Sequence, residues 1–299
     1  STMDIFPPLT SALAKAIESG QLAGAALDVF ENEPPKNSAL LALGSVIATP
    51  HLGASTEEAQ IAVSVDVAQS IVDFLLGRGI KNAVNVPVMD PEVFEQLRPY
   101  IQLAEKLGSL ETQLIDGQLL QVDIQYHGQV AEYDTTPITL AVIKGLLTPI
   151  LAESVNYVNA SVIAKERGIK ITESKSSTAS HYSNLIQVDV KTDKKKSGVA
   201  GTLFTREDTR IVRIDDFDVE AVPEGYILLI SNKDVPGIVG QIGTLLGDNK
   251  INIAGMTLGR DKPGGQATTL LKIDSAISDK VMQEIRKAKN ILDAKLIKL

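Results

Sequence analysis

A glutamate and a histidine, Glu33 and His51, are the residues of this sequence best suited to move a proton. Each follows a short apolar run (residues 23–30 and 45–49), and each lies beside a proline. A carboxylate that hydrogen-bonds an imidazole fixes its tautomer and raises its pKa, so the ring can exchange a proton near neutral pH. From residue chemistry alone, a solvated glutamate and a structural histidine are the commoner outcome.

Two buried strands, over residues 23–30 and 45–49, are expected to position this pair. Asp28 lies at the end of the first strand and His51 just past the second. Open α/β sheets bind their ligands at the carboxyl ends of strands, so these polar groups are expected to meet there.

Helices are expected on either side of these strands. One covers residues 11–19, and a capping box, Ser55-x-x-Glu58, is expected to open a longer one. Its apolar positions share one face, and Gly77 and Gly79 should end it before a strand over residues 80–87. That face carries Ile61, Val65, Ala68, Val72 and Leu75.

The middle of the chain is predicted to be a mixed α+β domain. Its first helix begins at residues 90–91 and should be interrupted by Pro99. Residues 120–127 alternate between apolar and polar, which is typical of a half-buried strand. Two helices (137–151 and 159–167) and five strands are then expected, the last of them antiparallel: 169–173, 185–191, 199–205, 211–214 and 217–219.

The last part of the chain follows a boundary at residues 223–225 and has the order βαββαβ, which is a ferredoxin-like arrangement. The expected strands are 226–231, 251–258, 266–273 and 291–299, and the helices are 236–248 and 279–289. The open edges of so small a sheet favour pairing with a second copy.

Composition limits the classes of function. The 299 residues include no cysteine and three histidines, with a net charge of −8. Disulfides, thiolate metal sites and cysteine nucleophiles are therefore absent, and no metal is expected. The negative charge argues against nucleic-acid binding, and no apolar run reaches membrane-spanning length, so a cytoplasmic protein is expected.

Two motifs make this chain resemble the D-2-hydroxyacid dehydrogenase family, and its phosphoglycerate-oxidising branch in particular. They are Asp-Val-Phe-x-x-Glu-Pro from Asp28 and Thr-Pro-His-x-Gly from Thr49. The resemblance implies that His51 is the acid/base and Glu33 its orienting carboxylate. It also implies that Asp28, His51, Gly53 and Ala54 lie at the NAD site, although a strand-end Asp28 can equally act as a cap.

A second resemblance lies in residues 231–240 and 252–254, which are similar to the ACT domain, an amino-acid-sensing module. It implies a homo-oligomer that holds L-serine as effector, bound by Asn232, Asp234 and Asn252, with the start of the following helix supplying free N–H groups. From spacing alone, a loop with turn-forming residues is the commoner outcome.

The middle domain resembles the intervening domain of long phosphoglycerate dehydrogenases, which implies an anion site. Its candidates are Arg206, Arg210 and Arg213, although a solvated strand face is commoner by base rate.

These features predict three parts: residues 1–88, the tail of a doubly wound NAD-dependent dehydrogenase core; residues 89–222, an α+β intervening domain; and residues 223–299, an ACT domain. The resemblance implies that the intact enzyme would oxidise 3-phospho-D-glycerate to 3-phosphohydroxypyruvate with NAD, for serine synthesis. The sequence contains no Gly-x-Gly-x-x-Gly run, so the chain alone is expected to be inactive and to bind NAD weakly. The alternatives are a stand-alone amino-acid-sensing or oligomerisation piece, and another dehydrogenase of this family with an ACT tail.

Overall fold

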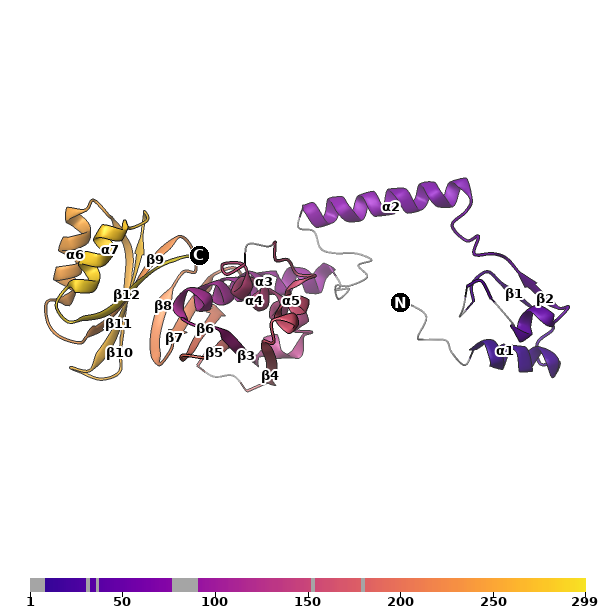
Figure 1. Ribbon diagram of the computed structural model, residues 1–299, viewed down its shortest axis with the longest axis horizontal. Helices are drawn as coiled ribbons and strands as arrows, with labels where there is room; N and C mark the ends of the chain where they lie inside the picture. The colour runs from indigo at the N-terminus through magenta and orange to yellow at the C-terminus, as the bar shows by residue number, and fades with distance from the viewer. Residues whose placement is uncertain (1–8, 31–32, 36–37, 77–90, 152–153, 179–180) are drawn as a thin grey trace. The chain divides into compact units, whose positions relative to one another are not determined.

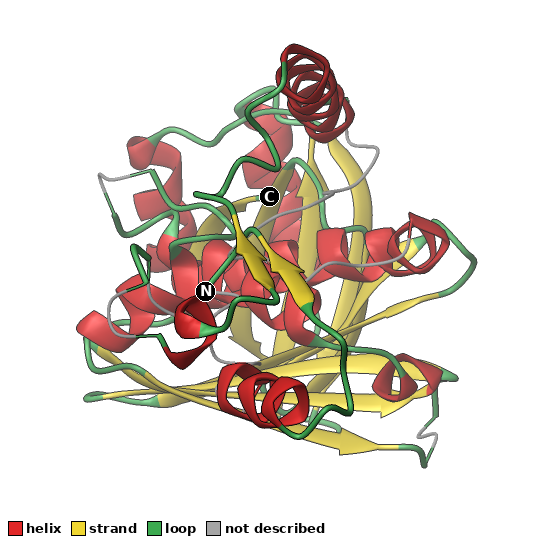
Figure 2. Ribbon diagram, turned by 90° about the vertical axis from the view of Figure 1, so that its right-hand side faces the viewer, coloured by secondary structure: helices red, strands yellow, loops and turns green. Residues whose placement is uncertain are grey.

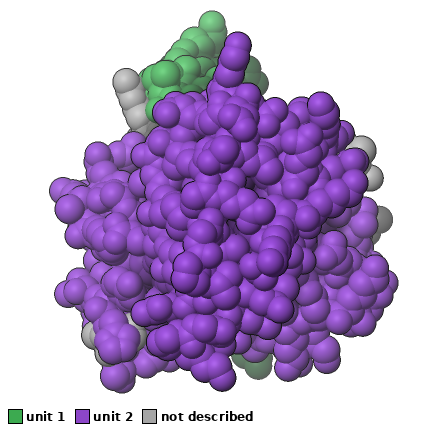
Figure 3. All heavy atoms as spheres, turned by 90° about the vertical axis from the view of Figure 1, so that its left-hand side faces the viewer, with its two compact units in different colours: residues 1–81 green, residues 82–299 purple. Residues whose placement is uncertain are grey.

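The computed structural model describes residues 9–30, 33–35, 38–76, 91–151, 154–178 and 181–299. The chain divides into two compact units, residues 1–81 and 82–299, which Figure 3 colours separately. Each unit is described by itself.

The first unit is a small α/β arrangement built on two parallel strands, β1 (Ala25–Leu27) and β2 (Val46–Ala48). Helix α1 (Leu9–Glu18) and the 3-10 helix η2 (Ala39–Ala42) bury Ala14, Ile17 and Leu40 in a core with residues of both strands. Each strand is shorter than the apolar run that predicted it, and only three residues of each form the β1–β2 ladder.

Helix α2 (Glu57–Leu75) begins one residue later than the expected capping box, which is therefore wrong. Thr56 is the N-cap, and its Oγ1 accepts a hydrogen bond of 3.2 Å from the Ala59 N–H. The Ser55 N–H donates in a turn to the Leu52 carbonyl, so it is not free to bond Glu58 as a capping box requires. The apolar face of α2 is exposed to solvent. Gly77, Gly79 and the strand expected over residues 80–87 lie outside the described residues.

The second unit begins with the middle domain, residues 91–221, in which helices cover one face of a six-stranded sheet (Figure 1, Figure 2). The sheet order is β4-β3-β5-β6-β7-β8, and all neighbours are antiparallel except the parallel pair β3 and β4. The strands are β3 (Leu119–Gly128), β4 (Lys170–Ser176), β5 (Asn184–Thr192), β6 (Lys196–Leu203), β7 (Thr209–Ile214) and β8 (Phe217–Ala221). The helices are α3 (Pro91–Leu114), η3 (Gln129–Glu132), α4 (Thr136–Leu147) and α5 (Ala160–Glu166).

The alternation that predicted strand β3 is confirmed from Val122 on: Val122, Ile124 and Tyr126 are fully buried, and the residues between them are partly exposed. It is wrong at Leu120, which is exposed where the register shifts between Leu119 and Gln121. The expected interruption of α3 at Pro99 is wrong, since the helix runs through it. Pro99 removes one helical hydrogen bond. The buried Leu97 and Ile101 on either side anchor the helix across this position.

Two glycines let α3 and α4 approach closely. A Cβ on Gly108 would lie 2.2 Å from the Val142 carbonyl oxygen, and one on Gly145 would lie 2.1 Å from that of Glu105. Only glycine fits such a backbone approach.

The C-terminal module, residues 226–298, has the predicted βαββαβ order and a sheet ordered β10-β11-β9-β12. Its elements are β9 (Tyr226–Lys233), α6 (Ile238–Asp248), β10 (Ile253–Arg260), β11 (Gln266–Ile273), α7 (Asp279–Lys287) and β12 (Ile291–Lys298). One face of the sheet packs under α6 and α7, around Leu228, Ile230 and Leu271. In Figure 1 these helices lie on the side away from β8.

The other face of this sheet shares its core with the middle domain. Leu229, Leu270 and Ile297 belong to the same hydrophobic cluster as the residues of α3. Polar contacts add to it, since the Lys295 ammonium donates to the Leu114 carbonyl at the end of α3, at 2.7 Å. The parallel pair β1–β2 of the first unit and the two mainly antiparallel sheets of the second confirm the predicted α/β and α+β fold class.

Within the described ranges, no helix is both long and apolar enough to cross a bilayer. The same residues contain no group of three or more histidine, aspartate or glutamate side chains that could hold a metal ion.

Candidate active site

The candidate active site lies at the carboxyl ends of β1 and β2. Backbone bonds continue beyond the ladder: the Thr49 N–H donates to the Leu27 carbonyl at 2.9 Å, and the His51 N–H donates to the Asp28 carbonyl at 3.0 Å. The two segments that follow the strands are therefore held side by side. This is the edge at which open α/β sheets place their ligands.

The Asp28 carboxylate organises the loop that carries His51. Its Oδ1 accepts from the Thr49 hydroxyl at 2.5 Å and from the Leu52 N–H at 2.7 Å, and its Oδ2 accepts from the Gly53 N–H at 2.7 Å. The Thr49 hydroxyl first, and then the Leu52 N–H, lower the pKa of Asp28 below its ordinary value. Asp28 is thus ionised at neutral pH, and three internal donors already surround it.

The backbone of His51 is held in an unusual conformation. Its φ is +55°, in the left-handed region that few residues other than glycine adopt. Such backbone strain persists where the surrounding structure enforces it, and it is frequent at functional sites. Here the enforcing contacts are the His51 N–H bond to Asp28 and the two N–H bonds that follow it.

Glu33 and His51 form the hydrogen-bonded pair that the sequence suggested. The His51 Nδ1 lies 2.7 Å from the Glu33 Oε2, and the Glu33 Oε1 accepts from the Phe30 N–H at 3.0 Å. The bond to Glu33, followed by its negative charge, raises the pKa of His51 above its ordinary value. The same bond lowers the pKa of Glu33. With Nδ1 engaged, Nε2 is the ring nitrogen that remains to exchange a proton.

A cavity of about 540 Å³ adjoins this pair. The polar groups on its wall are Asp28, Glu33, Thr49 and His51. The rest is largely apolar, formed by Phe30, Leu41, Ala48 and three prolines. The His51 side chain is 59% exposed and that of Glu33 is 29% exposed, so the imidazole can reach a bound molecule. Ala54 is exposed on the turn that leads to α2. The arrangement suits proton transfer to or from a small molecule with an apolar ring nearby.

The three residues predicted to bind an effector each have internal partners. Asn232 is buried, and its Oδ1 accepts from the Thr269 hydroxyl at 3.0 Å. The Asp234 Oδ2 accepts from the Gly264 N–H at 3.1 Å and pairs with Arg260 at 3.3 Å. The Asn252 amide donates to Asp274 at 2.7 Å. No hydrogen bond joins any two of the three residues.

The three candidate anion-binding arginines have different surroundings. Arg206 is exposed between β6 and β7. Arg210 is bound by Asp208 and lies 3.7 Å from Glu220, so carboxylates already neutralise it. Arg213 lies 3.9 Å from Asp189 in a separate pocket of the middle sheet.

Sequence reasoning missed the role of Thr49, whose hydroxyl makes the shortest contact to Asp28. The position of Thr49 in the sequence, two residues before His51, was the one signal that could have indicated this role. Glu111 was missed as well. It is fully buried on α3, and its position four residues after Leu107 on the same helix face could have revealed this.

Three family models match the chain in succession. Residues 9–53 match the D-isomer specific 2-hydroxyacid dehydrogenase, NAD binding domain; residues 96–215 match the D-3-phosphoglycerate dehydrogenase intervening domain; and residues 226–290 match the ACT domain. The order agrees with the three parts expected from the sequence.

Curated relatives with the name D-3-phosphoglycerate dehydrogenase match along the whole succession. The protein of Synechocystis sp. is 44% identical over 289 residues, which cover 96% of this chain and 52% of the relative. Those of Bacillus subtilis and Archaeoglobus fulgidus are each 42% identical, covering 97% of this chain and 55% of the relative. The chain thus spans about half the length of the curated relatives it matches.

Proposed function

We propose that this chain is part of an NAD-dependent enzyme. The reason is that the chain belongs to the D-3-phosphoglycerate dehydrogenases of the D-isomer specific 2-hydroxyacid dehydrogenase family. This enzyme would oxidise 3-phospho-D-glycerate to 3-phosphohydroxypyruvate, an entry reaction to L-serine. The Glu33–His51 pair beside its cavity carries the proposal.

In the proposed reaction His51 takes the proton of the substrate hydroxyl at Nε2. Glu33 holds Nδ1–H and offsets the positive charge that the ring then acquires. The chemistry that NAD would supply when bound is acceptance of a hydride from the carbon that bears this hydroxyl. In the reverse direction the His51 imidazolium returns the proton.

The chemical types of the residues at the cavity suit the binding of a nicotinamide ring. Phe30 and Leu41 supply apolar wall for a flat ring, and Asp28 lies beside His51. Three of the lone pairs of Asp28 are engaged, so it can accept a further hydrogen bond through Oδ2. Gly53 and Ala54 would line the same end.

The test uses this chain joined to the preceding half of the Bacillus subtilis relative, with activity followed as NADH formation. His51→Ala should lower kcat by about 10²–10⁴-fold, because proton transfer is lost. The control His181→Ala, on an exposed loop, should leave kcat unchanged. Near-normal turnover in His51→Ala would disprove the role of His51.

We also propose that the C-terminal module binds L-serine and pairs with a second copy. The match to the ACT domain supports an amino-acid effector. The edge strand β10 exposes Met256 and Leu258, which a second module could cover. Asn232, Asp234 and Asn252 would bind the ligand, together with the free N–H groups at the start of α6.

Serine binding is tested by thermal unfolding, since a ligand that binds the folded state raises Tm. L-serine at millimolar concentration should raise Tm of the wild type, and Asp234→Ala should lose about tenfold or more in affinity because an ion pair to the ammonium is lost. Equal serine responses in both proteins would argue against this site. The anion site at Arg206, Arg210 and Arg213, the oligomer and the cytoplasmic location stay predictions.

A further inference from the structure

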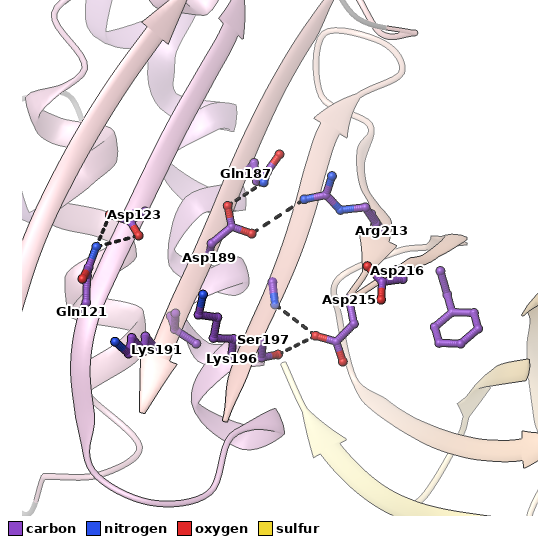
Figure 4. Close-up of a pocket in the computed structure, with 13 residues that line it drawn as sticks. Gln121, Asp123, Gln187, Asp189, Lys191, Lys196, Ser197, Arg213, Asp215 and Asp216 are labelled. Atoms are coloured by element: carbon purple, nitrogen blue, oxygen red, sulfur yellow. Dashed lines mark hydrogen bonds and ion pairs between the residues drawn. The ribbon is translucent and has the colours of Figure 1, made fainter. Parts of the chain in front are cut away.

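A second pocket lies on the middle sheet, in a part of the molecule that the proposed reaction does not use. Its volume is about 1020 Å³. The side chains that line it come mainly from β3, β5, β6 and the β7–β8 turn, and Figure 4 shows them along these strands. On β3 and β5 they alternate with buried residues such as Val122 and Val188, so they belong to the face opposite the helices.

The strand register sorts the charges of this face into rows. Lys191 pairs directly with Lys196 across β5 and β6. In the next row, two residues along the shared strand β5, Asp123 pairs directly with Asp189 across β3 and β5. The rows are about 6.5 Å apart, since a strand rises 3.2–3.4 Å per residue. Like charges directly opposite one another destabilise a sheet.

These like-charge rows do not neutralise each other. No ion pair within 4.0 Å joins either lysine to either aspartate, all four being described residues. The Asp123 carboxylate is held by the Gln121 amide at 2.9 Å, and Asp189 by the amides of Gln125 and Gln187. The hydrogen-bond donors to both carboxylates are therefore neutral amides.

Two further residues, Gly198 and Arg213, lie beside Asp189. The residue beside Asp189 on β6 is Gly198, where a Cβ would lie 2.3 Å from the Asp189 Oδ1. The Arg213 guanidinium approaches Asp189 to 3.9 Å, and its buried Nε has no hydrogen-bond partner among the residues that the structure describes. Glycine at position 198 therefore leaves the space that the Asp189 carboxylate occupies.

We propose that this face of the middle sheet binds a small zwitterion, a molecule with an ammonium group and a phosphate or carboxylate group on a short carbon chain. The ammonium lies between Asp123 and Asp189, and the anionic group lies on Lys191 and Lys196. Such a ligand relieves both like-charge pairs at once, which neither a simple cation nor a simple anion can do. The pocket is distinct from the active-site cavity and from the serine site proposed above.

Calorimetric titration of the whole 299-residue chain tests this proposal. The probes are O-phosphoethanolamine and β-alanine, which carry both charges, and ethanolamine and inorganic phosphate, which carry one each. One or both zwitterions should bind at least about tenfold more tightly than the single-charge probes. The stronger of the two identifies phosphate or carboxylate as the anionic group.

Variants locate the binding. Asp123→Asn and Lys196→Gln should each weaken zwitterion binding by about tenfold, since each removes one charge-assisted contact. The matched controls Glu166→Gln and Lys165→Gln, exposed on α5, should bind as the wild type does, and so should Asp234→Ala in the C-terminal module. Circular dichroism verifies that each variant is folded.

Several results would overturn the proposal. They are the absence of zwitterion binding to the wild type at millimolar concentration, equal binding of the single-charge probes, and wild-type binding by both folded pocket variants. Loss of binding in Asp234→Ala would place the zwitterion in the C-terminal module instead. Failure of the dehydrogenase or serine proposals leaves all these outcomes unchanged.

Discussion

Glu111→Gln should make the protein more stable in alkaline solution, because Glu111 is a buried carboxyl without a hydrogen-bond partner. Its side chain is fully buried on α3, and neither oxygen is bonded within the described residues. Burial raises its pKa from 4.5 to about 8; Ser197 opposes this rise, and the charges of Asp215 and Asp189 add to it. At neutral pH the folded protein therefore holds Glu111 largely as the neutral acid.

The sign of the effect follows from proton linkage. Between pH 4.5 and about 8 the unfolded chain has lost the Glu111 proton while the folded chain retains it. Folding takes up a proton in this window, so the free energy of unfolding falls as pH rises and levels off above about 8. For a rise in pKa of this size the loss is on the order of 5 kcal/mol, since one pH unit corresponds to 1.36 kcal/mol. Glutamine keeps the shape of the side chain and cannot ionise.

Urea unfolding followed by circular dichroism measures this difference, at about pH 5 and about pH 9. The free energy of unfolding of Glu111→Gln, minus that of the wild type, should be larger at the higher pH by several kcal/mol. Other titrating groups are common to both proteins and cancel in this difference. Glu166→Gln, an exposed glutamate on α5, should show no such change. A difference that is equal at the two pH values would refute the reasoning.

Two more predictions concern the candidate site and the helix packing. Glu33→Gln should lower the pKa of His51 toward its ordinary value, because the hydrogen bond and the negative charge of Glu33 raise that pKa. NMR titration of the three histidines measures it. An unchanged His51 pKa would contradict the pairing. Gly145→Ala should cost about 1–3 kcal/mol of unfolding free energy, since its Cβ would lie 2.1 Å from the Glu105 carbonyl oxygen; wild-type stability would show that α3 and α4 can move apart freely.

Much of the fold could be predicted because local patterns agreed with the burial that the fold provides. The alternation in β3 is one such case, with Val122, Ile124 and Tyr126 buried. The errors fall where a local rule met a stronger contact. Ser55 has the right spacing for a capping box, but a turn bond holds its N–H and Thr56 caps instead. Pro99 would end an isolated helix, but buried leucine and isoleucine neighbours hold α3 together.

The candidate site was predictable in its residue types and less so in its connections. The pair of Glu33 and His51 follows from two strand ends, because parallel strands bring their carboxyl ends to one edge. The binding of the Asp28 carboxylate to Thr49 and the N–H groups after His51 depends on the shape of a loop. Periodicity does not encode that shape.

The charge rows of the middle sheet are harder still to predict from a sequence pattern. Asp123 and Asp189 are far apart in the chain, and each taken alone is an ordinary strand residue on a half-exposed face. The register of β3 against β5 places them opposite each other, and the register of β5 against β6 places two lysines in the next row. A one-residue slip in either pairing would move these charges into the core. The buried valines on the other face therefore fix the register, and through it the electrostatics of the pocket.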